Sequence, residues 1–373
     1  MNSQTIIPGE RLVSIDALRG LAMFLIIAYD IGGAPVFQTF TKLWGENFAN
    51  AASVQFEYHF TTGLRFSFIA MPMFLFVVGL VIPLSLNNRL LQKDKKGIYF
   101  HIFRRVIILF LLGLIAGGHL LQLKFANMPV YNNVLEYISI SYLVCAILVL
   151  NTTTKVQYII TAGLLLLYWA IWLFIPAPGW QGDIYSTEMN IGIYVENIVL
   201  VNHGSNFGSW TGVFNTISHI SIAMIGVLIG KIIFGSRNKA DKTKLLFISG
   251  FAMIIAGKLW GLLFPIMRCY MTSSFVLVSV GIAILLLASF YLIIDVWGYS
   301  KWAFFFIAFG LNSIAIYMMA HLFDFRLIGN ILVGGISNLF SSNVQAFIQA
   351  VTAMIIMWLI MYWMYLKKTF IKI

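Results

Sequence analysis

The segment from Arg11 to Gly33, RLVSIDALRGLAMFLIIAYDIGG, is an apolar run with charged residues near both ends. Ser14 is the predicted N-cap of a helix, and Asp16 and Arg19 lie on one helix face, where they can neutralise each other. Asp30 follows Asp16 by fourteen residues, close to a whole number of turns, and lies about 21 Å further along the axis. The segment therefore predicts a membrane helix with an acidic residue near each membrane surface.

The composition excludes a soluble globular protein. Of 373 residues, 60% are hydrophobic and only 10% are charged, whereas soluble domains carry about 25% charged residues. Apolar runs of about 20 residues recur along the chain, which indicates helices and not the short alternating strands of a membrane barrel. The predicted fold is therefore an all-α integral membrane protein, a polytopic bundle of about ten transmembrane helices, with residues 1–373 forming a single domain.

The apolar runs predict ten spans. They cover residues 13–33, 65–86, 102–121, 134–151, 157–176, 213–234, 245–264, 273–294, 302–323 and 345–366. With this topology, 18 of the 24 Lys and Arg residues fall on the side of the two termini, which the positive-inside rule makes cytoplasmic. We therefore expect a multi-pass protein of the inner (cytoplasmic) membrane. Its net charge of +11 then reports orientation in the lipid bilayer and not nucleic-acid binding.

Three of the predicted outer connections are long, and they cover residues 34–64, 177–212 and 324–344. The first carries Trp44 and Phe48 among small and polar residues, which suits an interfacial helix or a lid over the bundle. The second is rich in Gly, Asn and aromatic residues. Such a composition suits a carbohydrate-binding loop and equally describes any exposed loop.

The two cysteines, Cys145 and Cys269, form no CxxC motif, so we expect neither a structural disulfide nor a metal site. The N-terminus lacks a basic region followed by an apolar region and a cleavage signal, so we expect no cleaved signal peptide. No heptad seam or GxxxG pair decides whether the chain forms a homodimer, and that alternative stays open.

Ionisable residues near the ends of membrane spans are costly in lipid and therefore mark candidate sites. The predicted outer set is Asp30, Glu57, His59, Lys258, Arg268, His321 and Asp324, and the inner set is Asp16, Arg19, Arg104, Arg105, Lys231, Asp295 and Lys301. Glu136 and His219 fall at depths that the sequence does not define. For each residue taken alone, a snorkelling charge or a satisfied buried polar group is the alternative.

Several motifs resemble, in their order and spacing, those of heparan-alpha-glucosaminide N-acetyltransferase and its bacterial relatives, a family of multi-span membrane acyltransferases. They are RLVSIDALRG (11–20), QFEYHFTTGLRF (55–66), MPMFLFVVGLVIPLSL (71–86), LLFPIMRCYMTSSFVLVSVG (262–281), GLNSIAIYMMAHLFD (310–324) and LKKTFIKI (366–373). The resemblance covers the whole chain. It implies transfer of an acetyl group from cytoplasmic acetyl-CoA to a sugar, an amino sugar or a glycan end, at the outer face.

The resemblance also implies roles for individual residues. His59 is the expected catalytic base or acyl carrier, with Asp30 as the carboxylate that orients it. Acetyl-CoA is expected to bind through cations on the cytoplasmic side, which are Arg19, Arg104, Arg105 and Lys231. Signals of topology alone are the alternative for these four. The acceptor is expected to contact Glu57, Tyr58, Lys258, Arg268, Asn312 and His321.

The chain departs from the family at the expected site itself. Tyr58 stands where the family has its His, so His59 is displaced by one residue. Four other family positions are substituted, by Thr61 for Trp, Phe68 for Asp, Tyr137 for Arg and Met271 for Trp. The alternative interpretation is therefore a member that has lost catalysis and serves as a transporter, a glycan-binding protein or a subunit of a membrane complex.

Overall fold

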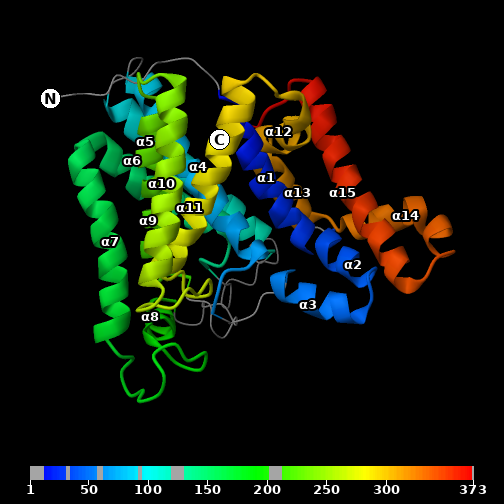
Figure 1. Ribbon diagram of the computed structural model, residues 1–373, viewed down its shortest axis with the longest axis horizontal. Helices are drawn as coiled ribbons and strands as arrows, with labels where there is room; N and C mark the ends of the chain where they lie inside the picture. Colours follow the sequence, from blue (N-terminus) through cyan, green and yellow to red (C-terminus); the bar gives the residue numbers. More distant parts are fainter. Residues whose placement is uncertain are drawn as a thin grey trace.

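The computed structural model describes residues 12–30, 34–56, 62–90, 95–118, 130–200 and 212–371, and every regular element in these ranges is a helix (Figure 1). The predicted all-α membrane fold is confirmed, because eight of these helices are long and apolar enough to cross a membrane. They are α4 (Ala70–Leu90), α5 (Lys95–Ala116), α6 (Val134–Asn151), α7 (Thr154–Phe174), α9 (Thr216–Ile233), α10 (Lys239–Trp260), α11 (Ser273–Phe290) and α15 (Ser342–Leu366).

Two further elements coincide with the remaining predicted spans. Helix α1 (Val13–Asp30) has 18 residues, but three of them are charged: Asp16, Arg19 and Asp30. The predicted span 302–323 is not one helix. It is divided into α12 (Phe304–Leu311) and α13 (Ser313–Leu322), which are bent by 65° at the intervening residue.

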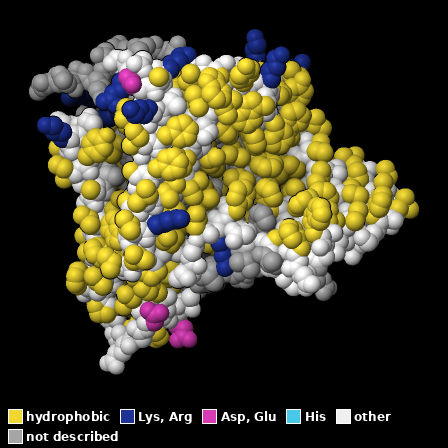
Figure 2. Space-filling model, in the orientation of Figure 1, with side chains coloured by type: hydrophobic (Ala, Val, Ile, Leu, Met, Phe, Trp, Pro, Cys, Tyr) yellow, Lys and Arg dark blue, Asp and Glu magenta, His cyan; other side chains and the backbone are white. Residues whose placement is uncertain are grey.

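Helix α1 starts and helix α15 ends at the same end of the bundle, as an even number of crossings requires (Figure 1). Lys and Arg side chains gather at that end of the molecule, while its lateral surface is largely apolar (Figure 2). We call this end the inner end and the opposite end the outer end, after the orientation that the charges predict.

Helix α5 begins at Lys95, seven residues before the start of the predicted span. The expected position of Arg104 and Arg105 at the inner end of this helix is therefore wrong. They follow Lys95 by nine and ten residues and lie near the middle of the helix, about 14 Å from its start. The charged segment before the apolar run belongs to the same helix. Composition alone therefore does not show that the helix begins before its apolar part.

The outer connections contain helices of their own. They are α2 (Val36–Lys42), α3 (Glu46–Phe56), α8 (Ile191–Val199) and α14 (Phe325–Ser337). Helices α2 and α3 occupy the segment predicted as an interfacial helix, with the Trp44 and Phe48 side chains exposed. Helix α14 packs along α15, and both project to one side of the bundle together with α2 (Figure 1).

Helix α4 lies at the centre of the bundle and packs against α1, α5, α6, α9 and α11. Its contact with α9 brings the two backbones together at Gly226 and Gly230, where an added Cβ would lie 2.3 Å from Phe76 O and 2.2 Å from Leu80 O. These glycines have the GxxxG spacing that allows close helix contact in membranes. The chain uses this spacing to pack its own helices.

The predicted orientation can be tested with single cysteines in an otherwise cysteine-poor chain. Both native cysteines, Cys145 and Cys269, are buried, so labelling of the unmodified protein should be low. A membrane-impermeant maleimide applied to intact cells should modify Gln181→Cys in the outer connection and spare Ser236→Cys between α9 and α10, both at exposed positions. The opposite pattern would reverse the orientation.

Candidate functional site

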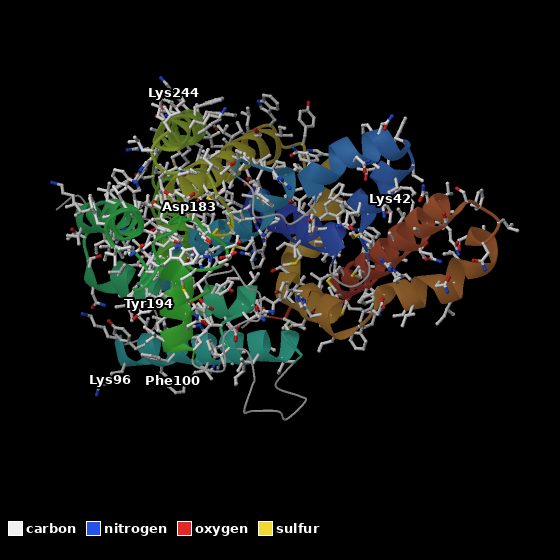
Figure 3. All side chains as sticks on the ribbon, turned by 90° about the horizontal axis from the view of Figure 1, so that it is seen from below. Lys42, Lys96, Phe100, Asp183, Tyr194 and Lys244 are labelled. Atoms are coloured by element: carbon white, nitrogen blue, oxygen red, sulfur yellow. The ribbon has the colours of Figure 1, made fainter. Side chains whose placement is uncertain are left out.

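A set of buried and half-buried polar side chains lies where the outer ends of α6, α8 and α9 meet. We call it the outer polar cluster: its buried members are Tyr131, Glu136, Glu196 and His219, and its half-buried members are Tyr137 and Thr216. Burial of ionisable side chains is expensive and is typical of functional sites. In the view from the outer end, Asp183 and Tyr194 of the α7–α9 region lie on the opposite side of the molecule from Lys42 of α2 (Figure 3).

The start of α6 places Glu136 in this cluster. Asn133 caps the helix, because its side chain accepts a hydrogen bond from Leu135 N (3.0 Å), and Glu136 completes a capping box. Glu136 Oε2 accepts hydrogen bonds from the Asn132 and Asn133 N–H groups (2.7 and 2.8 Å). Its other oxygen, Oε1, is buried and has no hydrogen-bond partner among the described residues.

Aromatic rings connect Glu136 to α9. The Tyr137 ring stacks on the His219 ring, with centroids 4.7 Å apart, and contacts the Tyr131 ring at 5.1 Å. Thr216 donates a hydrogen bond to the Tyr131 hydroxyl (2.7 Å). His219 is only 2% exposed, and within the described parts of the chain its Nδ1 atom has no hydrogen-bond partner. A buried ring nitrogen in this state is a site at which a ligand or an ordered water can bind.

Helix α8 supplies the second buried acid, Glu196. Asn190 caps this short helix by accepting a hydrogen bond from Ile193 N (2.9 Å). Glu196 Oε2 accepts one from Val213 N (3.1 Å) at the start of the chain segment that leads into α9. A Cβ added to Gly212 would lie 3.2 Å from the Tyr137 hydroxyl and 3.3 Å from Glu196 Oε1. The Tyr131 carbonyl oxygen would lie still closer, at 2.7 Å, so these three oxygens pack tightly around the Gly212 backbone.

The local environment alters the proton affinity of the groups outside the membrane spans. Burial raises the pKa of Glu196 to about 7, although hydrogen bonds from the Val213 and Gly212 N–H groups oppose this shift. Burial also raises the pKa of Tyr131 to about 12. At neutral pH, Tyr131 is therefore a neutral hydrogen-bonding group, whereas Glu196 exchanges a proton with its surroundings.

Two arginines lie next to the outer polar cluster. The Arg65 and Arg268 guanidinium groups lie over the same Phe68 ring, 5.6 and 5.2 Å from its centroid. Phe68 shares an apolar cluster with Tyr137. The segment that leads into α4 and the loop between α10 and α11 thus each place one cation on this ring, in the apolar cluster that also includes Tyr137.

A backbone hydrogen bond fixes these two segments to each other, from Gly63 N to Ile266 O (2.7 Å). The expected catalytic segment precedes Gly63 directly in sequence. Its residues Glu57, Tyr58 and His59 lie outside the described residues, which end at Phe56 in α3 and resume at Thr62. Asp30 is the last residue of α1, a helix that packs against the segment η2 (Phe66–Ile69).

The other expected acceptor residues lie in three different places. His321 accompanies the outer polar cluster, because its ring contacts the Tyr317 ring (4.2 Å) and Tyr317 donates a hydrogen bond to Asn133 (3.1 Å). Lys258 is exposed near the outer end of α10. Asn312 lies at the bend between α12 and α13, where its side chain bonds the backbone of Thr369 and Ile371 and so anchors the chain after α15.

The expected acetyl-CoA residues lie on three helices, each with contacts of its own. The Arg19 guanidinium lies 4.0 Å from the Asp16 carboxylate, and Lys231 donates hydrogen bonds to Thr154 (2.9 Å) and Gln157 (2.6 Å) of α7. No direct contact within the described residues links the two cations.

The remaining two cations are on α5. The Arg105 guanidinium lies over the Tyr142 ring of α6, 4.5 Å from its centroid, and Arg104 is exposed. Arg105 Nε and the Tyr142 hydroxyl are buried and, among the described residues, have no hydrogen-bond partner. These unsatisfied atoms near mid-helix indicate a place where a polar ligand could bind.

The N-terminus of α1 is capped differently from the prediction. Ser14 lies inside the helix, and the Asp295 carboxylate accepts hydrogen bonds from Val13 N and Ser14 N (3.2 Å each). The Ser14 N-cap prediction is therefore wrong. Lys239 donates a hydrogen bond to the Asp295 carbonyl (2.8 Å). Because an acid already occupies this helix end, it is not a binding site for a phosphate group.

Sequence reasoning marked Glu136 and His219 without a depth and missed Glu196. The signal for Glu196 is a lone acid in an otherwise apolar stretch, IGIYVENIVL, within the predicted outer connection 177–212. Arg65 is one of the six Lys and Arg residues that the predicted topology places on the outer side, and the pattern gives it no other role. In the described part of the chain, His, Cys, Asp and Glu side chains nowhere gather in a group of three that could hold a metal ion.

Comparison with protein families decides the general chemistry. A family described as an acyltransferase domain matches residues 12–365. The chain belongs to this acyltransferase family. The match extends from α1 to α15 and so includes both the outer polar cluster and the inner cations. No curated protein matches the chain. The acyltransferase is thus a multi-pass membrane protein whose polar side chains lie at both ends of the bundle and near its middle.

Proposed function

We propose that this acyltransferase transfers an acetyl group from acetyl-CoA, which binds from the cytoplasmic side, to a sugar at the outer face of the inner membrane. The observation that carries the proposal is the outer polar cluster, with two buried carboxylates and an imidazole, at the end opposite the start of α1 and the end of α15. Two guanidinium groups lie over the nearby Phe68 ring. Hydroxyl-rich and amine acceptors are bound by such groups through hydrogen bonds and charge.

The reaction requires a group that accepts the proton of the attacking nucleophile. The resemblance to heparan-alpha-glucosaminide N-acetyltransferase supports His59 in this role or as acyl carrier, with Asp30 as its orienting carboxylate. Arg65 and Arg268 lie over Phe68. Arg65 belongs to the segment that adjoins His59 in sequence, and Arg268 belongs to the loop that is hydrogen-bonded to that segment. They would hold the acceptor beside the acetyl group.

The donor would supply an activated acetyl thioester. Arg19 and Lys231, in the inner part of the bundle, would face its phosphates. Arg104, which is exposed and precedes Arg105 directly, is the other expected acetyl-CoA residue on α5. Arg105 lies too deep for a phosphate at the membrane surface, about 15 Å from the start of α5. Its unsatisfied Nε and the Tyr142 hydroxyl would instead bond the amide or thioester oxygens of the coenzyme arm.

Binding of labelled acetyl-CoA to the purified protein in detergent tests this arrangement. Arg105→Gln should weaken binding about ten-fold or more, because a lost charge-assisted hydrogen bond costs roughly 1.5–3 kcal/mol. Lys244→Gln removes a charge from an exposed position on α10 and should leave the affinity unchanged. Equal affinities of the two variants would remove Arg105 from the donor site.

The alternative is a member that binds a sugar without transferring an acetyl group, as a transporter, a glycan-binding protein or a subunit of a larger assembly. The substitutions in the expected site favour it. The same preparation separates the two proposals, since acetyl-CoA must bind and acetylate an amino sugar in the first. Sugar binding without any acetyl-CoA binding would support the alternative.

A further inference from the structure

The chain after α15 does not continue along the helix axis. Helix α15 ends in a Schellman motif, in which Lys368 N donates a hydrogen bond to Tyr365 O (3.0 Å) and Thr369 N donates one to Met364 O (2.9 Å). Lys368 has the left-handed backbone angle φ of 52° that this motif requires. Residues 367–371 then run back towards α1 and α12 at the inner end (Figure 1). We call residues 367–371 the inner strap.

Asn312 holds the inner strap. This residue lies between α12 and α13, where the span is bent by 65°, and it is only 1% exposed. Its Nδ2 donates a hydrogen bond to Thr369 O (3.1 Å), and its Oδ1 accepts one from Ile371 N (3.0 Å). Within the described residues, these two are the only hydrogen bonds that connect the strap to a helix other than α15. The position of the strap therefore depends largely on one side chain.

The other residues of the strap hold it only weakly. Thr369 and Ile371 are exposed, and Phe370 is half-buried. A neutral hydrogen bond makes a modest net contribution to stability, and fixing five residues costs conformational entropy. The bound and released states of the strap therefore differ little in free energy, and a ligand that favours one of them can shift the balance.

The strap lies at the proposed entrance of the donor. Gly310, two residues before Asn312, packs on the first turn of α1, where a Cβ added to it would lie 1.9 Å from Asp16 O. The Arg19 guanidinium, which is proposed to face the donor's phosphates, lies 4.0 Å from the Asp16 carboxylate. The anchor of the strap is therefore close to the donor cation of α1, at the end from which acetyl-CoA would enter.

We propose that the inner strap controls entry of the donor. While the strap is bound to Asn312 it closes the way past α1, and acetyl-CoA binds when these two hydrogen bonds break and the strap is displaced. This inference rests on the proposed binding of acetyl-CoA from the inner end. Because strap and donor compete for the same space, the donor binds the released state more tightly. Its apparent affinity is then lowered in proportion to the fraction of molecules with the strap in place.

Two variants release the strap by different means. Asn312→Asp keeps the shape of the side chain but replaces the Nδ2 donor with an oxygen that repels Thr369 O, and a chain that ends after Lys368 lacks both bonded residues. Each should bind labelled acetyl-CoA about five-fold more tightly than the wild type, which corresponds to a strap bound in about four-fifths of the molecules. Asn343→Asp is the matched control, because Asn343 Nδ2 bonds the Lys42 carbonyl at the outer end (3.3 Å), and its affinity should be that of the wild type.

A nitroxide label on Ile371→Cys reports the strap directly, and a purely structural role would leave its signal unchanged by the donor. Its electron paramagnetic resonance spectrum should change from restricted to mobile when acetyl-CoA is added, and should already be mobile in the Asn312→Asp background. Unchanged or weaker acetyl-CoA binding in both release variants, or a spectrum that acetyl-CoA does not alter, would overturn the inference. Absence of acetyl-CoA binding in the wild type and in both release variants would instead overturn the proposed function.

Discussion

His59→Ala is expected to lower acetyl transfer by roughly 10²- to 10⁴-fold, the range for a lost general acid or base. Acetyl-CoA binding should remain, because the cations proposed to bind the donor lie in the inner and central parts of the bundle, on α1, α5 and α9. Steady-state transfer to an amino sugar, measured together with acetyl-CoA affinity, separates the two effects. Asp30→Asn should cost less, since the amide still orients the imidazole ring.

Tyr58→Phe is the matched control, because the resemblance to heparan-alpha-glucosaminide N-acetyltransferase aligns Tyr58 with the His of that family. It removes only a hydroxyl group and should leave transfer close to the wild-type rate. Wild-type turnover in His59→Ala would remove this histidine from the mechanism. Loss of transfer in Tyr58→Phe alone would move the chemistry by one residue.

Gly20→Val is expected to prevent the bundle from forming. Helices α1 and α12 touch through their backbones, and a Cβ at Gly20 would lie 1.7 Å from Phe306 O, while one at Gly310 would lie 1.9 Å from Asp16 O. No rotamer change relieves a contact with backbone atoms, so the helices must separate. The cost should be about 3 kcal/mol or more, at the upper end for overpacked sites.

The measurement is the yield of monodisperse protein in detergent and its thermal unfolding midpoint. Gly163→Val is the control, because Gly163 lies in the membrane helix α7 and an added Cβ would meet nothing within 4 Å. It introduces the same β-branched side chain without a clash. Similar yields and midpoints for the two variants would contradict the close contact between α1 and α12.

The bundle was predictable because lipid demands about 20 apolar residues in every crossing helix. Its details depend on contacts that the pattern does not contain. The bend at Asn312 is stabilised by side-chain hydrogen bonds to Thr369 and Ile371. The α1 cap comes from Asp295, 281 residues beyond Ser14. Hydropathy reports the average polarity of a segment and cannot indicate which distant residue completes its hydrogen bonds.

The same limit applies to the candidate site. Glu136 and His219 stood out as ionisable residues in apolar runs, but Glu196 was hidden in a connection that the charge pattern only places outside. The outer polar cluster exists because the chain after α8 returns to α6 and places Gly212 between Glu196 and Tyr137. That return is a tertiary contact between loops, and no period or spacing in the sequence records it.

The structure relates three of the substitutions that distinguish the chain from the resembling family. Phe68 and Met271 are buried in one apolar cluster, and Tyr137 packs against it. The positions at which the resemblance would place an acid, a basic residue and a Trp therefore lie together, in one apolar cluster.

Transfer across a sealed membrane tests the central claim most directly. Proteoliposomes are sorted by orientation through labelling of Ser236→Cys. Labelled acetyl-CoA is then supplied on the side of the α9–α10 connection, and D-glucosamine is present only on the other side. The account predicts labelled N-acetyl sugar in the compartment that never contained acetyl-CoA. Acetylation that occurs only when both substrates share one compartment would contradict it.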